Sequence, residues 1–221
     1  MSSMPRMAAL IHNDGMEPTI RQGSIAVSEY PQLSAKKWEI VGYRSPLTLE
    51  QACFIASRDS TFFKGLGRDQ LEAFYKEHFA TFGPMRINRV GRIVALGGES
   101  IELKSDGIYI NNSKASPPGR TAELYSSLPD GAWKKYFSAG PINVPEHEVF
   151  ILQDNLEKGN DSRTLGTVKL TSILGTLNNV IEPEEILKPG FFNAEADRFP
   201  KDLLQDLEEQ HGPMSTWFKP N

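Results

Sequence analysis

The residues with the clearest chemical potential lie in one polar string, Gln153 to Gly166, with the sequence QDNLEKGNDSRTLG. Its asparagines, aspartates and glycines favour turns, and apolar runs typical of strands lie on either side of it. The pattern therefore predicts a tight polar loop between two strands. Asp161 and Arg163 flank Ser162, and a carboxylate and a guanidinium at that spacing can form an ion pair that clamps the loop.

Four further stretches stand out along the chain: GMEPTIRQG at 15–23, WEIVGYRSP at 38–46, RIVALGGE at 92–99 and GIYINNSK at 107–114. Together with the string at 153–166, they resemble the motifs of type I signal peptidases and the mitochondrial inner-membrane peptidases. The corresponding family patterns are SM-x-PT-L/I-x-x-G, GDIV-x-V/A-x-S/N-P, KR-V/I-V/I-G-L-x-GD, G-x-L/V-YINGK and GDN-x-x-x-S-x-DSR-x-x-G. The resemblance implies a mainly β, signal-peptidase-like fold.

The resemblance fails at the positions where the family carries out hydrolysis. The family's serine nucleophile corresponds to Gly15, its lysine base to Gly91, and the serine that orients this lysine to Gly159. The reaction needs a hydroxyl whose proton passes to a neutral lysine, and glycine supplies neither group. The resemblance therefore implies a catalytically degenerate member, a pseudopeptidase with no catalytic residue and no cofactor.

Neighbouring residues offer a rival, enzymatic interpretation. Arg89 and Arg92 flank the position of the missing lysine, but a guanidinium stays protonated near neutral pH and is not a general base. An acid–base pair of Asp14 and Asp161 is conceivable. The chain would then be a presequence peptidase with a displaced nucleophile, or one whose site a partner completes.

Five residues of the family pattern are expected to support the fold rather than the reaction. By resemblance, Pro18 and Gly98 shape turns, and Asp161, Ser162 and Arg163 form the clamp of the signature loop. This set is the structural signature that the chain retains.

The former substrate groove is also placed by resemblance. Met16 should line its floor, and Asn13 should lie near the former oxyanion hole. A groove without a nucleophile can still bind an extended peptide by strand addition at a sheet edge, or the chain's own insertion can fill it. No metal site is expected: His78 lies on an apolar stripe, where packing is commoner than ligation.

Composition describes a globular chain without a general affinity for nucleic acid. Of 221 residues, 39% are hydrophobic and 24% charged, and the net charge of −4 argues against a nucleic-acid coat. Cys53 is the only cysteine, so no internal disulfide can form, and its apolar surroundings predict burial. No stretch approaches the roughly 18–20 apolar residues of a membrane span, so we expect no membrane span within the chain.

The periodicity predicts a β core with two additions. Residues 1–46 and 86–182 form the core, including a small β subdomain at about 104–143, of which 115–143 reads as irregular because of its prolines and glycines. Residues 47–85 form a helical insertion: Leu71, Tyr75 and Phe79 share helical spacing within 68–82, and Gly83-Pro84 ends the helix. Residues 183–221 form a C-terminal extension with a short helix near 200–210.

These expectations favour a protein–protein scaffold. We predict an accessory or assembly subunit of a larger mitochondrial complex, ribosomal or respiratory, that contacts other subunits through 47–85 and 183–221. RNA would be a partner only if the complex is ribosomal. The motif MEPTI at 16–20 together with NDSR at 160–163 looks closer to the mitochondrial than to the bacterial peptidases, which suggests the matrix or the matrix side of the inner membrane.

Overall fold

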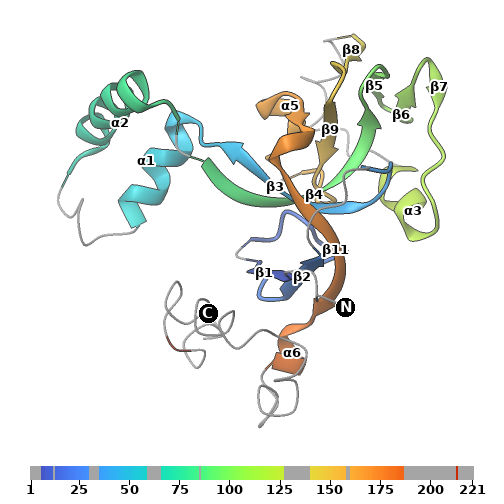
Figure 1. The fold of residues 1–221 in the computed structure, drawn as a ribbon, viewed down its shortest axis with the longest axis horizontal. Helices are drawn as coiled ribbons and strands as arrows, with labels where there is room; N and C mark the ends of the chain where they lie inside the picture. Colours follow the sequence, from blue (N-terminus) through green and yellow to red (C-terminus); the bar gives the residue numbers. More distant parts are fainter. Residues whose placement is uncertain are drawn as a thin grey trace. The chain divides into compact units, whose positions relative to one another are not determined.

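The structure, a computed structural model, describes residues 6–11, 13–29, 35–58, 66–84, 86–126, 140–157, 160–186 and 213 (Figure 1). The chain divides into two compact units. One is the segment Arg44–Arg89, and the other comprises the residues before and after it. The larger unit carries the positions that correspond, by resemblance, to the family's reacting groups.

The larger unit is built on a seven-stranded sheet. Across it the order is β1 (Arg6–Leu10), β2 (Ile25–Glu29), β11 (Ile173–Ile181), β3 (Ile40–Pro46), β4 (Arg86–Leu96), β9 (Glu148–Leu152) and β10 (Val168–Lys169). Strands β4 and β9 are antiparallel, with Arg92 opposite Leu152 and Ile93 opposite Ile151. This register brings the centre of β4 beside the residues that lead into the polar loop.

A second sheet of four strands has the order β7 (Ser113–Lys114), β6 (Gly107–Ile110), β5 (Ser100–Lys104) and β8 (Ile142–Asn143). Its apolar residues join Phe150 and Leu152 of β9 in one buried cluster. The mainly β fold predicted from the sequence is confirmed, because most described elements are strands in antiparallel sheets. The second sheet begins at Ser100, a few residues before the boundary that the sequence suggested.

One helix in this region contradicts the prediction that 115–143 is irregular. Helix α3 (Arg120–Ser126) follows Gly119, whose φ is +52°. Tyr125 on this helix is 3% exposed and packs in the same cluster as β9. The sequence does not predict this helix because tertiary packing of Tyr125 and Leu124, rather than a local apolar repeat, stabilises it. Residues 127–139 lie outside the described part.

The unit Arg44–Arg89 contains two packed helices. Helix α1 spans Leu49–Arg58 and helix α2 spans Arg68–Phe82, which confirms the helix predicted at 68–82. Gly83 ends α2 with a φ of +78°, and its N–H donates to Phe79 O. The buried cluster of this unit comprises Leu47, Ala52, Cys53, Ala56, Leu71 and Tyr75, so the prediction that Cys53 is buried is also correct.

Three short elements complete the described chain. They are helix α5 (Ser162–Leu165), the 3₁₀ helix η1 (Leu170–Ser172) and helix α6 (Pro183–Ile186). The helix predicted near 200–210 lies outside the described residues. Within the described ranges, no helix is both long and apolar enough to cross a membrane.

Candidate functional site

The turn at 13–16 is fixed by a hydrogen bond to one of its own side chains and by hydrogen bonds from the polar loop. The Gly15 N–H donates to Asn13 Oδ1 over 3.0 Å. Asn155 donates twice to the turn, from its backbone N–H to Gly15 O at 2.9 Å and from Nδ2 to Asp14 O at 3.0 Å. The structure thus places Gly15 against the signature loop, and the Gly15 amide points at a side-chain oxygen of its own turn.

The space beside Gly15 is occupied by a side chain from that loop. A Cβ atom at position 15 would lie 2.6 Å from Gln153 Nε2 and 2.7 Å from both Cδ and Oε1 of the same residue. Carbon atoms normally make contact at about 3.5–4.0 Å. The space beside the Gly15 Cα therefore cannot hold a side chain unless Gln153 moves.

The space beside Gly91 is also filled, and by less movable atoms. A Cβ atom there would lie 2.5 Å from Ile151 Cγ2, 3.1 Å from the carbonyl oxygen of Leu152 and 3.3 Å from Tyr43 Cε1. Ile151 and Tyr43 are fully buried. Because Leu152 belongs to the strand paired with β4, its carbonyl cannot retreat without disturbing the sheet.

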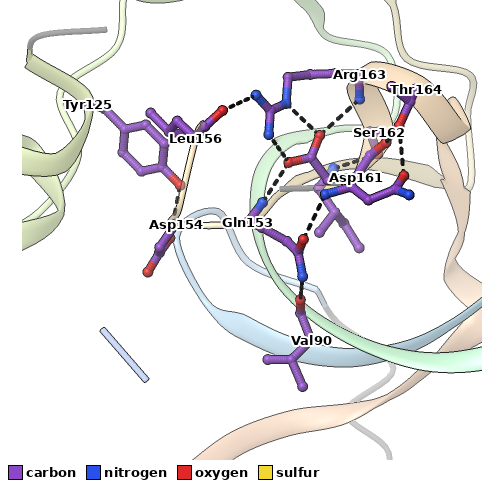
Figure 2. Close-up of polar contacts among 11 residues, drawn as sticks. Val90, Tyr125, Gln153, Asp154, Leu156, Asp161, Ser162, Arg163 and Thr164 are labelled. Carbon is purple, nitrogen blue, oxygen red and sulfur yellow. Dashed lines mark hydrogen bonds and ion pairs between the residues drawn. The ribbon is translucent and has the colours of Figure 1, made fainter. Parts of the chain in front are cut away.

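Gln153 connects the segments beside Gly91 and Gly159, two positions that the family resemblance assigns to the former reaction centre (Figure 2). Its Nε2 donates to Val90 O at 3.2 Å, and its Oε1 accepts from Asn160 N–H at 2.8 Å. Sequence reasoning passed over this residue. The signal was available, because Gln153 stands where the family pattern GDN-x-x-x-S-x-DSR has its first glycine.

The predicted clamp of the loop is present. Arg163 Nε and Nη2 donate to Asp161 Oδ1 and Oδ2 at 2.7 and 2.6 Å, and Nη1 donates to Leu156 O at 2.7 Å (Figure 2). Asp161 also caps helix α5 by accepting from the backbone N–H of Arg163. Ser162 Oγ accepts from Ile151 N–H at 2.9 Å. The three residues therefore act as a structural unit that joins the loop to β9.

A second buried ion pair joins β4 to the start of the loop. Arg92 Nε and Nη2 donate to Asp154 Oδ1 and Oδ2 at 2.9 and 2.6 Å, while Nη1 donates to Trp38 O at 2.8 Å. The Tyr125 hydroxyl donates to Asp154 Oδ1 at 2.9 Å. Such planar, doubly hydrogen-bonded pairing is the strong form of an arginine–carboxylate contact.

Burial and charge explain the protonation of Arg92 and Tyr125, the two donors to Asp154. Burial lowers the pKa of the Arg92 guanidinium, but the hydrogen bonds to Asp154 and the charge of that carboxylate outweigh it, so the pKa lies above its ordinary value. Burial, followed by the negative charge of Asp154, raises the pKa of Tyr125 well above its usual range. Both groups therefore stay protonated at neutral pH and act as fixed donors rather than as acids or bases.

Asp161, one carboxylate of the rival acid–base pair, already accepts hydrogen bonds at both of its oxygens. Asp161 is fully buried, and its Oδ2 accepts from Gln153 N–H and from Arg163 while its Oδ1 accepts from Arg163 twice. A general base must offer a lone pair to a substrate proton. Proton abstraction by Asp161 would require the loop to open first.

The remaining predicted site residues have mainly structural positions. Met16 is 1% exposed and packs with Ile11, Ile20 and Ala26, so its assignment to a groove floor stays a prediction. Pro18 follows a cis peptide bond, and Gly98 has a φ of +82° in the turn between β4 and β5. Gly159 lies outside the described residues.

His78, which the sequence predicts to pack on the apolar stripe, lies among aromatic rings. Its ring centroid is 6.1 Å from that of Phe74 and 5.1 Å from that of Phe82. Among the described residues, no group of three or more histidine, cysteine, aspartate or glutamate side chains is arranged to hold a metal ion.

Comparison with known proteins identifies similar chains. A family model described as "Signal peptidase, peptidase S26" matches residues 4–181. Signal peptidase I S of Bacillus subtilis is 34% identical over 98 residues, which are 44% of this chain and 53% of that protein. Signal peptidase I of Rickettsia typhi is 30% identical over 117 residues, covering 41% of this chain and 44% of that protein. The chain thus spans about half the length of the curated relatives that it matches.

A solved structure shows a weaker similarity. The crystal structure of a signal peptidase I from Enterococcus faecalis V583 has a TM-score of 0.37 and 20% sequence identity with this chain. The match covers 66% of this chain and 97% of that one.

Proposed function

Since the chain belongs to the signal peptidase family, peptidase S26, we propose that it is a non-catalytic member of that family and acts as a scaffold that binds other protein subunits. The proposal combines a peptidase fold with a site that lacks the family's reacting groups. By the family pattern, catalysis needs a serine hydroxyl in contact with a lysine amine. The positions that correspond to these two residues are Gly15 and Gly91.

The observation that carries the proposal is the packing around Gly91. A glycine in an open site would leave room for a neighbouring amine to move in and replace the missing lysine. Here Ile151 and Tyr43 occupy the space where a side chain at position 91 would begin. The interior around β4 therefore leaves no space for a base at position 91, which favours a structural role over a displaced catalytic group.

The proposed scaffold role differs from the activity that the relatives' names state. Those proteins are named as signal peptidases, and the match covers about half of their length. A scaffold role and the identity of the partner complex are therefore proposals. The mitochondrial location likewise stays a prediction from the motifs, since the relatives named above are bacterial.

The unit Arg44–Arg89 is the part of the described chain that we propose for partner contact. It has its own buried cluster, yet Phe82 at the end of α2 is 76% exposed and Phe74 is 43% exposed. Aromatic side chains are enriched at protein interfaces. The C-terminal extension, proposed for the same role, lies outside the described residues except for 183–186 and Pro213.

Native purification of the tagged full-length chain tests the scaffold role. We expect the wild type to elute in an assembly larger than a monomer and to retain the same partner proteins through successive columns. Phe82→Ser should weaken this association at least several-fold, because truncating an aromatic anchor removes buried apolar contact. Glu72→Gln, at an exposed ion pair on the same helix, is the control. A monomer that retains no partner, or equal partner recovery by both variants, would contradict the proposal.

A further inference from the structure

We propose that the side chain of Gln153 is a built-in occupant of the former reaction centre, which closes that site and makes a side chain at position 15 destabilising to the native fold. This inference deepens the proposed function and depends on it for the identification of Gly15 as the former nucleophile position. The steric part depends on the geometry alone.

The occupant fills the space that a nucleophile would need. All three of the nearest atoms to a Cβ at position 15 are the terminal atoms of Gln153, at 2.6–2.7 Å. A serine hydroxyl would extend further still, since its oxygen lies beyond the Cβ. The same carboxamide would meet any peptide carbonyl that approached Gly15 from this side.

Hydrogen bonds hold the carboxamide at both ends. Nε2 donates to Val90 O, the residue before Gly91, and Oε1 accepts from the Asn160 N–H, next to position 159. A neutral carboxamide can donate from its nitrogen and accept at its oxygen at the same time. Methionine would fill a similar volume and satisfy neither backbone group, and an ionised glutamate would set an acceptor against Val90 O.

The backbone of Gln153 is fixed as well, so the side chain cannot move aside at little cost. Its N–H donates to Asp161 Oδ2 at 2.9 Å, within the clamp formed with Arg163 (Figure 2). Gln153 is 6% exposed. Rotation of the carboxamide away from this position would leave the partly buried Val90 carbonyl and Asn160 N–H without these partners, which is costly.

The structure thereby links two departures from the family pattern. Glycine has replaced the nucleophile at position 15, and glutamine has replaced glycine at position 153. Each change suits the other: the small residue makes room for the large one. The two positions should therefore be energetically coupled, as residues in contact generally are.

A double-mutant cycle on the full chain measures this coupling. The variants are Gly15→Ala, Gln153→Ala and the combination, each followed by thermal unfolding. Gly15 does not have a positive φ, so alanine is acceptable to its backbone. We expect Gly15→Ala to lower the midpoint temperature by about 3–8 °C in the wild-type background, because two partly buried hydrogen bonds are displaced. In the Gln153→Ala background, the same change should lower it by less than about 1 °C.

Gly42→Ala is the matched control for this cycle. A Cβ at Gly42 would make an ordinary contact of 3.8 Å with Leu174 Cβ, so its effect should be small and the same in both backgrounds. If Gly15→Ala is as mild as Gly42→Ala in the wild type, the proposed closure is wrong. The closure is also wrong if the Gly15→Ala effect is the same with and without Gln153.

A further variant separates the hydrogen bonds from the volume of the side chain. Gln153→Met keeps a side chain of similar size and should still lower the midpoint by several degrees, because Val90 O and Asn160 N–H lose their partners. A Gln153→Met protein as stable as the wild type would overturn the bridging role. These outcomes do not depend on activity: peptide cleavage by the wild type would refute the scaffold proposal and leave the measured coupling unchanged.

Discussion

Lysine introduced at position 91 is expected to reduce the free energy of unfolding by about 4 kcal/mol or more, rather than to restore a catalytic base. Overpacking a well-filled core costs about 1–3 kcal/mol, and an ammonium placed among apolar side chains adds a desolvation cost. The first carbon alone would lie 2.5 Å from Ile151 Cγ2 and 3.1 Å from Leu152 O. Relief would require the paired strands β4 and β9 to separate.

Urea unfolding of Gly91→Lys, Gly91→Ala and Gly42→Ala measures this effect. The alanine at position 91 should cost less than the lysine but more than the alanine at position 42, where the contact is ordinary. A Gly91→Lys protein as stable as Gly42→Ala would mean that β4 has space for a base after all. That result would remove the main support for a non-catalytic site.

Loss of the buried carboxylate at position 154 is expected to have the second large effect, about 3–5 kcal/mol of unfolding free energy. Asp154→Ala leaves the Arg92 guanidinium buried without its counter-charge, and it also removes the acceptor of the Tyr125 hydroxyl. Arg92 and Asp154 are 6% and 3% exposed, so water cannot readily replace the lost contact. The network ties β4 and helix α3 to the signature loop.

Denaturant unfolding with a surface control tests this expectation. Glu72→Ala removes an exposed pair with Lys76 on helix α2, and exposed pairs contribute little. Asp154→Ala should therefore shift the urea midpoint far more than Glu72→Ala. Equal shifts would indicate that the Arg92–Asp154 pair does not hold the loop in place.

The sequence was most informative where local pattern and tertiary burial agree. Helix α2 was predictable at 68–82 because its apolar spacing and the following Gly83-Pro84 indicate the same boundaries. The ion pair of Asp161 and Arg163 was predictable because both partners lie in one short loop. The mainly β fold followed from the resemblance of five short motifs spread along the chain.

Other features depend on contacts between distant segments and could not be read locally. Helix α3 is held by Tyr125, whose hydroxyl reaches Asp154, 29 residues further along the chain. The role of Gln153 depends on Gly15, which lies far away in sequence and has no side chain to suggest a contact. The available clue was that Gln153 stands where the family pattern has a glycine. Its contact with Gly15 became visible only from the packing in the structure.

A single-turnover cleavage assay tests the central claim most directly. The purified chain is incubated in molar excess over a precursor that carries a signal peptide, and the products are followed by mass spectrometry. A type I signal peptidase is the positive control. Asp14→Asn is the variant that tests the rival acid–base site. The account predicts no cleavage above the rate without protein, for the wild type and the variant alike. Specific cleavage by the wild type that Asp14→Asn abolishes would contradict it.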